Sequence, residues 1–106
     1  MQPDPEFPNA PEGWSRSKAE VLATQEGLEL GEDHWRLIRA IHEYFARNET
    51  PRARQMHDAF DELFHNKGGI RYLYQLFPRG PVAQGCRLAG LKAPAGTTDK
   101  SFGSVG

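Results

Sequence analysis

The longest regular pattern of apolar positions in the chain follows Gly31 and ends before Asn48. Its central stripe lies at residues 34, 38, 41 and 45, which is the spacing of one face of a helix. Glu32 and Asp33 fall in the first turn, where the partial positive charge of a helix N-terminus favours acidic side chains. We therefore predict the main core helix here, with these apolar positions: Trp35, Leu37, Ile38, Ile41, Tyr44 and Phe45.

A second helical pattern follows the segment Asn48-Glu49-Thr50-Pro51 and continues to about His65, before Gly68-Gly69 ends it. Thr50 is predicted to be its N-cap and Pro51 its first residue, because the first helical position does not need the N–H that proline lacks. The inward positions are predicted to be Ala53, Met56, Ala59, Phe60, Leu63 and Phe64. The two helices and their short connection resemble a helix-turn-helix.

Three shorter helices are predicted at residues 17–25, 70–77 and 81–89. The first begins at a capping box, Ser17-Lys18-Ala19-Glu20, and stops at Gly27. The run 70–77 alternates in a way that would also suit a strand, but the sequence offers no second strand to pair with it, so we predict a helix closed by Pro78. Gly80-Pro81 starts the last helix.

The two ends of the chain lack such patterns. Residues 1–13 contain four prolines and one large apolar residue, Phe7, so we expect a mobile arm in which little is buried. Residues 90–106 are poor in apolar side chains and are expected to form a flexible C-terminal arm. The predicted fold is mostly α: one domain of about five helices at residues 14–89, with a helix-turn-helix-like core, between two arms.

Length and composition fit one small globular domain. The chain has 106 residues, of which 38% are apolar and 25% charged. Residues 1–50 hold ten acids and five bases, a net of −5, whereas residues 51–106 hold four acids and eight bases, a net of +4, so an anionic partner is expected to prefer the second half. The sequence has no apolar run long enough to cross a membrane and does not start like a signal peptide, and its one cysteine cannot form an internal disulfide. We therefore expect the protein in the cytoplasm.

The sequence carries no motif for metal or cofactor binding. The four histidines and the cysteine lack the spacing of paired metal ligands, so we expect no metal site. A glycine-rich phosphate loop is absent as well, so we expect no nucleotide cofactor.

DNA binding is one functional alternative. Arg52, Arg54 and Gln55 lie at the start of the second patterned helix, where helix-turn-helix proteins place base-reading side chains. Acidic residues follow at positions 58, 61 and 62 and would repel phosphates. We therefore expect weak DNA binding at most.

Cys86 is the only nucleophile of note, and two interpretations of it are open. A lone cysteine on a short helix is often a small, buried and inert residue. Arg79, Arg87 and Lys92 are near in sequence, and cationic neighbours lower the pKa of a thiol and make it more reactive.

Three blocks of sequence point to a family when they are taken together. They are Leu28-Glu29-Leu30-x-Glu32-x-His34-Trp35, Tyr72-Leu73-Tyr74-x-Leu76-Phe77-Pro78-x-Gly80-Pro81 and Gln84-Gly85-Cys86-Arg87-Leu88-Ala89-Gly90-Leu91. In order and spacing they resemble the DsrC/TusE family of sulfur-relay proteins, also called the gamma subunit of dissimilatory sulfite reductase, from about residue 14 to residue 94. The resemblance implies a small helical cytoplasmic protein with an N-terminal hairpin and a mobile C-terminal arm. Only residues 7–14 resemble part of that hairpin.

The resemblance also implies roles for two positions near the C-terminus. In the family a penultimate cysteine on the arm carries sulfur as a persulfide, and in the sulfite-reductase partners an earlier cysteine closes a disulfide or trisulfide with it. Cys86 matches the earlier cysteine, and Thr97, eleven residues on, stands at the carrier position. A hydroxyl cannot hold a persulfide.

The sequence therefore predicts a binding or regulatory protein of sulfur metabolism, not itself an enzyme, that docks on sulfur-transfer or sulfite-reductase-type proteins. Two alternatives stay open: a sulfur relay that uses Cys86 itself, and a helix-turn-helix regulator that binds DNA. The side chains expected to contact the partner protein are Tyr72, Tyr74, Arg79, Arg87, Lys92 and Phe102, the last as an aromatic anchor on the arm.

Overall fold

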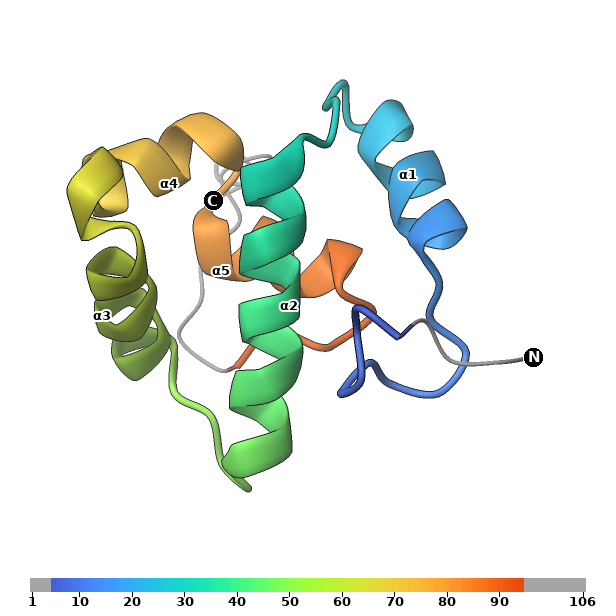
Figure 1. Cartoon of the computed structure of the whole chain (residues 1–106), viewed down its shortest axis with the longest axis horizontal. Coiled ribbons are helices and arrows are strands. Elements are labelled where there is room, and N and C mark those ends of the chain that lie inside the picture. Colours follow the sequence, from blue (N-terminus) through green and yellow to red (C-terminus); the bar gives the residue numbers. More distant parts are fainter. Residues whose placement is uncertain (1–4, 95–106) are drawn as a thin grey trace, which may run out of the picture.

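The computed structural model describes residues 5–94, whose regular structure is entirely helical (Figure 1). The elements are α1 (Arg16–Gln25), α2 (Glu32–Arg47), α3 (Ala53–Leu63), the 3₁₀ turn η1 (His65–Lys67), α4 (Ile70–Leu76) and α5 (Pro81–Leu88). The predicted mostly α class is confirmed, and the ambiguous run 70–77 forms a helix. No strand occurs between residues 5 and 94, so the hairpin implied by the resemblance is not formed there.

Helix α5 is the central element of this fold. It packs against α1, α2, α3 and α4, and all residues from Gly80 to Cys86 are buried. Gly85 permits the close approach of α5 to α2, because a Cβ at this position would lie 2.7 Å from Ile41 Cδ1. The surrounding core therefore fixes the position of α5 from several directions.

The core is built mostly from the apolar stripes that the sequence predicts, but the predicted inward residues Ala59 and Leu63 of α3 are exposed. Leu37, Ile38 and Ile41 of α2 are fully buried, and each such side chain contributes about 1.5–3 kcal/mol relative to an exposed one. Other buried members are Ala23, Met56, Phe60, Phe64, Leu73, Leu76, Phe77, Val82, Leu88 and Ala89. Trp35, Tyr44 and Phe45 are only partly buried and pack against the edge of this core.

Two helices begin at other residues than the sequence predicts. Ser15, and not Ser17, is the N-cap of α1: its extended backbone lets its Oγ accept a hydrogen bond from the Lys18 N–H, at 3.2 Å. The backbone stays extended through Arg52, which is the N-cap of α3, so the helix starts two residues after Pro51. The first error is a choice between two serines of equal capping ability, whereas Arg52 makes no side-chain cap hydrogen bond and replaces Thr50, which is the better N-cap residue.

The prediction that little is buried in residues 1–13 is wrong for Phe7. This side chain is 0% exposed and packs against the rings of Trp14, Trp35 and His42, with centroid distances of 4.9, 5.9 and 5.8 Å. The Arg39 side chain donates a hydrogen bond from Nε to the Glu6 carbonyl, at 2.8 Å, and so holds this segment against α2. One aromatic side chain is enough to fix a stretch that is otherwise rich in proline.

None of the helices within residues 5–94 has the length and apolar character needed to span a membrane.

Candidate functional site

The thiol of Cys86 lies inside the core, in the second half of α5. The residue is 0% exposed, and burial raises the pKa of the thiol to about 12. Desolvation is the cause, because a low-dielectric surrounding disfavours the thiolate. Of the two interpretations left open for Cys86, burial supports the inert thiol and not one whose pKa is lowered by Arg79, Arg87 and Lys92.

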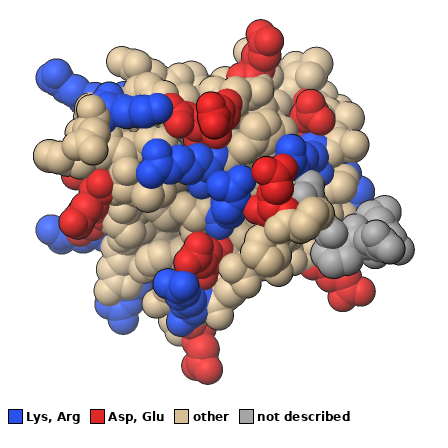
Figure 2. Space-filling view, viewed as in Figure 1, with Lys and Arg blue, Asp and Glu red and all other residues tan. Residues whose placement is uncertain are grey.

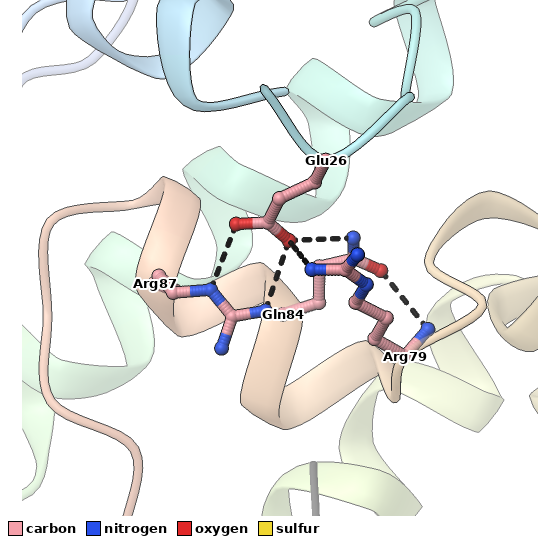
Figure 3. A network of polar contacts seen from close by, with 4 residues as sticks. All are labelled: Glu26, Arg79, Gln84 and Arg87. Carbon is pink, nitrogen blue, oxygen red and sulfur yellow. Dashed lines mark hydrogen bonds and ion pairs between the residues drawn. The ribbon is translucent and has the colours of Figure 1, made fainter. Parts of the chain in front are cut away.

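The arginines near Cys86 in sequence instead point toward one carboxylate, that of Glu26 at the C-cap of α1 (Figure 3). Arg87 makes a two-pronged contact, with Nε 2.9 Å from Oε2 and Nη2 2.9 Å from Oε1. Arg79 Nη1 lies 3.4 Å from Oε1. These hydrogen bonds, the Arg87 contact first, hold the pKa of Glu26 below its ordinary value.

Gln84 completes the set of donors around the Glu26 carboxylate. Its Nε2 donates to Oε1 at 2.9 Å, while its Oε1 accepts a hydrogen bond from the Arg79 backbone N–H at 3.1 Å. Gln84 is 1% exposed, and both ends of its amide have partners. The amide therefore has a fixed orientation, with its N–H groups facing the carboxylate.

Two side chains hold the other end of α5, where the C-terminal segment begins. Trp14 donates from Nε1 to the Leu88 carbonyl at 2.8 Å, and His42 donates from Nε2 to the Ala89 carbonyl at 2.9 Å. Gly90 then turns the chain with a φ of 79°, and a Cβ there would lie 2.9 Å from Trp14 Cδ1. These contacts satisfy carbonyls that the end of a helix leaves unpaired.

The first residues of the expected C-terminal arm belong to the packed body of the molecule. Leu91 and Ala93 pack against the core, and the Leu91 N–H donates to the Cys86 carbonyl at 2.9 Å. The expectation of a flexible arm from Gly90 onward therefore does not describe residues 91–93. Thr97 and Phe102 lie outside the described residues.

The predicted partner-binding residue Tyr72 is engaged at a second polar cluster, between α2 and α4. Its hydroxyl and the Lys67 ammonium both donate to Asp33, the ammonium at 2.8 Å. Tyr74 is half-buried and Lys92 is exposed. The structure therefore does not bring the predicted contact residues together into one cluster: Arg79 and Arg87 meet at Glu26, whereas Tyr72 turns to Asp33.

The residues of the DNA-binding alternative lie exposed at the start of α3. They are Arg52, Arg54 and Gln55. Asp58 and Glu62 lie exposed further along the same helix, where they oppose the approach of phosphates. The side chains of the DNA-binding alternative are thus followed on the same helix by acidic groups, which carry the same charge as DNA phosphates, as the sequence predicts.

The acidic and basic halves of the sequence do not become separate surfaces. Glu26 pairs with Arg79 and Arg87, and Asp33 with Lys67, so each pair joins the two halves. Figure 2 shows basic and acidic side chains interspersed on the visible face. Sequence reasoning missed Glu26 because its partners lie 58 and 61 residues away and no local pattern connects them.

Comparison with known proteins assigns a family to this arrangement. The family described as DsrC like protein matches residues 4–97. The Sulfurtransferase TusE of Salmonella typhimurium is 40% identical over 83 residues, and that of Yersinia pestis is 41% identical over 83 residues; each match covers 76% of both chains. The NMR structure of Allochromatium vinosum DsrC superposes with a TM-score of 0.67 at 41% identity, covering 80% of this chain and 78% of that one. This chain therefore belongs to the DsrC-like family.

Proposed function

We propose that this protein is a binding or regulatory member of the DsrC-like family that docks on sulfur-transfer or sulfite-reductase-type proteins without itself carrying a persulfide. The observation that carries the proposal is the state of its only cysteine: the Cys86 thiol is fully buried, and its pKa is raised to about 12. The protein would thus keep the docking surface of a relay component and lack the transfer chemistry.

The chemistry of sulfur transfer supports this proposal. A thiolate, not a thiol, attacks a persulfide, and a thiol whose pKa is raised to about 12 is almost entirely protonated at pH 7. Transfer between two proteins also requires their sulfur atoms to touch, which a side chain with 0% exposure does not allow. A relay through Cys86 would therefore require α5 to leave the core.

The position that the family uses for its carrier supports the same conclusion. By the resemblance that position is Thr97, and a hydroxyl does not form a persulfide. We further propose that the protein acts in the cytoplasm and has no catalytic activity of its own. The residues proposed to contact the partner are Tyr72, Tyr74, Arg79, Arg87, Lys92 and Phe102.

Intact mass measurement tests the absence of carrier activity. The protein is incubated with a persulfidated sulfurtransferase, next to a Cys86→Ser variant and a denatured sample in which the thiol is accessible. We expect the native protein to gain no sulfur and the denatured sample to be modified. A gain of one sulfur atom in the native protein that disappears in Cys86→Ser would establish the relay alternative instead.

A pull-down from native lysate tests the docking part of the proposal. The bait is the full chain, and sulfite-reductase or sulfurtransferase subunits are expected among the retained proteins. A chain truncated after Ala95 and a Phe102→Ala variant test the C-terminal residues, and we expect both to retain less partner. If no protein of these classes is retained by the full chain, the docking proposal is wrong.

A further inference from the structure

The polar cluster in Figure 3 has the composition of a carboxylate-binding site. Two guanidinium groups and one amide surround a single carboxylate, and four donor–acceptor distances, three of 2.9 Å and one of 3.4 Å, converge on its two oxygens. A two-pronged arginine contact matches the planar geometry of a carboxylate. In the isolated chain the occupant is Glu26.

Two of the three donors, Gln84 and Arg87, are side chains of α5, and Arg79 lies just before this helix. Gln84 and Arg87 are three residues apart on one helix and so share a face. The Gln84 amide is oriented by the Arg79 backbone N–H, and the helix beneath is buried from Pro81 to Cys86. The Gln84 amide therefore keeps one of its two anchors when the carboxylate is removed.

Glu26, in contrast, belongs to the helix with the smallest share of the core. The buried residues of α1 are two alanines, Ala19 and Ala23, while Val21 is 57% exposed. Gly27 follows with a φ of 74° and open space around its Cβ position. The fully buried side chains of the helix that precedes Glu26 are therefore small.

The site is also accessible from the surface. The side chains of Arg79 and Arg87 are 38% and 33% exposed, whereas that of Glu26 is 11% exposed. A carboxylate of another molecule can thus reach the outer edges of both guanidinium groups before Glu26 leaves. The lowered pKa of Glu26 supports the preference of this site for the anionic form.

From this geometry we infer that Arg79, Gln84 and Arg87 form a binding site for a carboxylate side chain of a docking protein, and that Glu26 occupies this site as an internal competitor in the isolated chain. The inference rests on the proposed docking function for the source of that carboxylate. Because Glu26 is tethered, its effective concentration at the site is high, so an acidic partner displaces it only when further contacts add to the affinity. The site would then favour partners with an acidic residue within a larger interface.

Chemical rescue tests whether the site accepts an external carboxylate. In Glu26→Ala the carboxylate is absent, and propionate is added while the melting temperature is followed against sodium chloride at equal ionic strength. A ligand that binds only the folded state raises its stability, so we expect propionate to raise the melting temperature of Glu26→Ala by several degrees and to leave the natural sequence unchanged. Equal behaviour of propionate and chloride in Glu26→Ala would overturn the inference.

A matched variant and a second ligand complete the test. Glu29→Ala removes the same charge from an exposed position three residues after Glu26. Propionate should not raise the melting temperature of this variant more than sodium chloride does. A short polyglutamate peptide should shift the side-chain NMR signals of Gln84 and Arg87 in Glu26→Ala, and more weakly in the natural sequence. Should Glu26→Ala not fold, the same titration on Glu26→Gln decides. If propionate raises the melting temperature of Glu26→Ala but the peptide causes no NMR shift, the assignment of the site to a protein partner is overturned. If propionate raises the melting temperature but the pull-down captures no partner, only the proposed docking function is contradicted.

Discussion

Helix α5 is held by two kinds of contact that differ in exposure and charge. Toward α2 and the N-terminal segment, neutral donors on Trp14 and His42 bind the Leu88 and Ala89 carbonyls inside a cluster of aromatic rings. Toward α1, arginines that are about one-third exposed pair with Glu26. Buried contacts of the first kind contribute most to stability, whereas partly exposed ion pairs contribute little and are easily exchanged. The buried side of α5 therefore stabilises the fold, and the charged side is the one for which we propose recognition.

The largest loss of stability is expected at Phe7, on the buried side. Phe7→Ala removes a fully buried ring that touches Trp14, Trp35 and His42, and should lower the free energy of unfolding by about 3–5 kcal/mol. Urea denaturation measures the change. Pro8→Ala, at the exposed neighbouring position, is the control and should change the stability by less than about 0.5 kcal/mol. A loss below about 1 kcal/mol for Phe7→Ala would show that the N-terminal segment is not part of the core in solution.

An intermediate effect is expected from pH, again on the buried side. Burial lowers the pKa of both His34 and His42 below 6.5, so the unfolded chain binds protons that the folded chain does not. The free energy of unfolding should be constant between about pH 7 and pH 8 and fall as the pH decreases below 6.5, by at most about 1.4 kcal/mol per pH unit for each histidine. The lowered pKa values of Glu26 and Asp33 act only below their ordinary values of 4.5 and 3.8, outside this range.

Urea denaturation at several pH values between 5 and 8 measures this effect. His34 gives a structural reason for it: Nε2 donates to the Leu76 carbonyl and Nδ1 accepts from the Gly31 N–H, so protonation of Nδ1 would place two donors against each other. His42→Gln should reduce the slope of stability with pH. A slope that survives His34→Gln and His42→Gln together would refute the assignment.

The two sides of α5 also differ in how far the sequence predicts them. The stripe of α2 and the Gly80-Pro81 start of α5 are local signals, and both elements are predicted with nearly the observed bounds. The burial of Phe7 depends on Trp35, 28 residues away, and a single aromatic residue among prolines gives no periodicity to detect. The Glu26 contacts are even harder to predict from the sequence, because the paired charges come from opposite halves of the chain.

Cys86 shows why a site can be misjudged from sequence even when its neighbours are identified. Arg79 and Arg87 are cationic and near in sequence, but both form ion pairs with Glu26. On a buried helix, adjacent residues point in different directions, so the cation at position 87 does not determine the environment of the thiol at position 86. Burial does so instead, and it raises the pKa of this thiol.

The smallest effects are expected on the charged side, from the two arginines compared with each other. Arg87→Ala removes a two-pronged contact at 2.9 Å and should lower the free energy of unfolding by about 1 kcal/mol. Arg79→Ala removes one ion pair at 3.4 Å while its backbone N–H still binds Gln84, and should cost less than about 0.5 kcal/mol. Both losses should shrink in high salt, which screens partly exposed charges but does not affect the Phe7→Ala loss. If either arginine variant loses as much stability as Phe7→Ala, the charged contacts hold α5 in place, and the separation between a stabilising side and a recognition side is wrong.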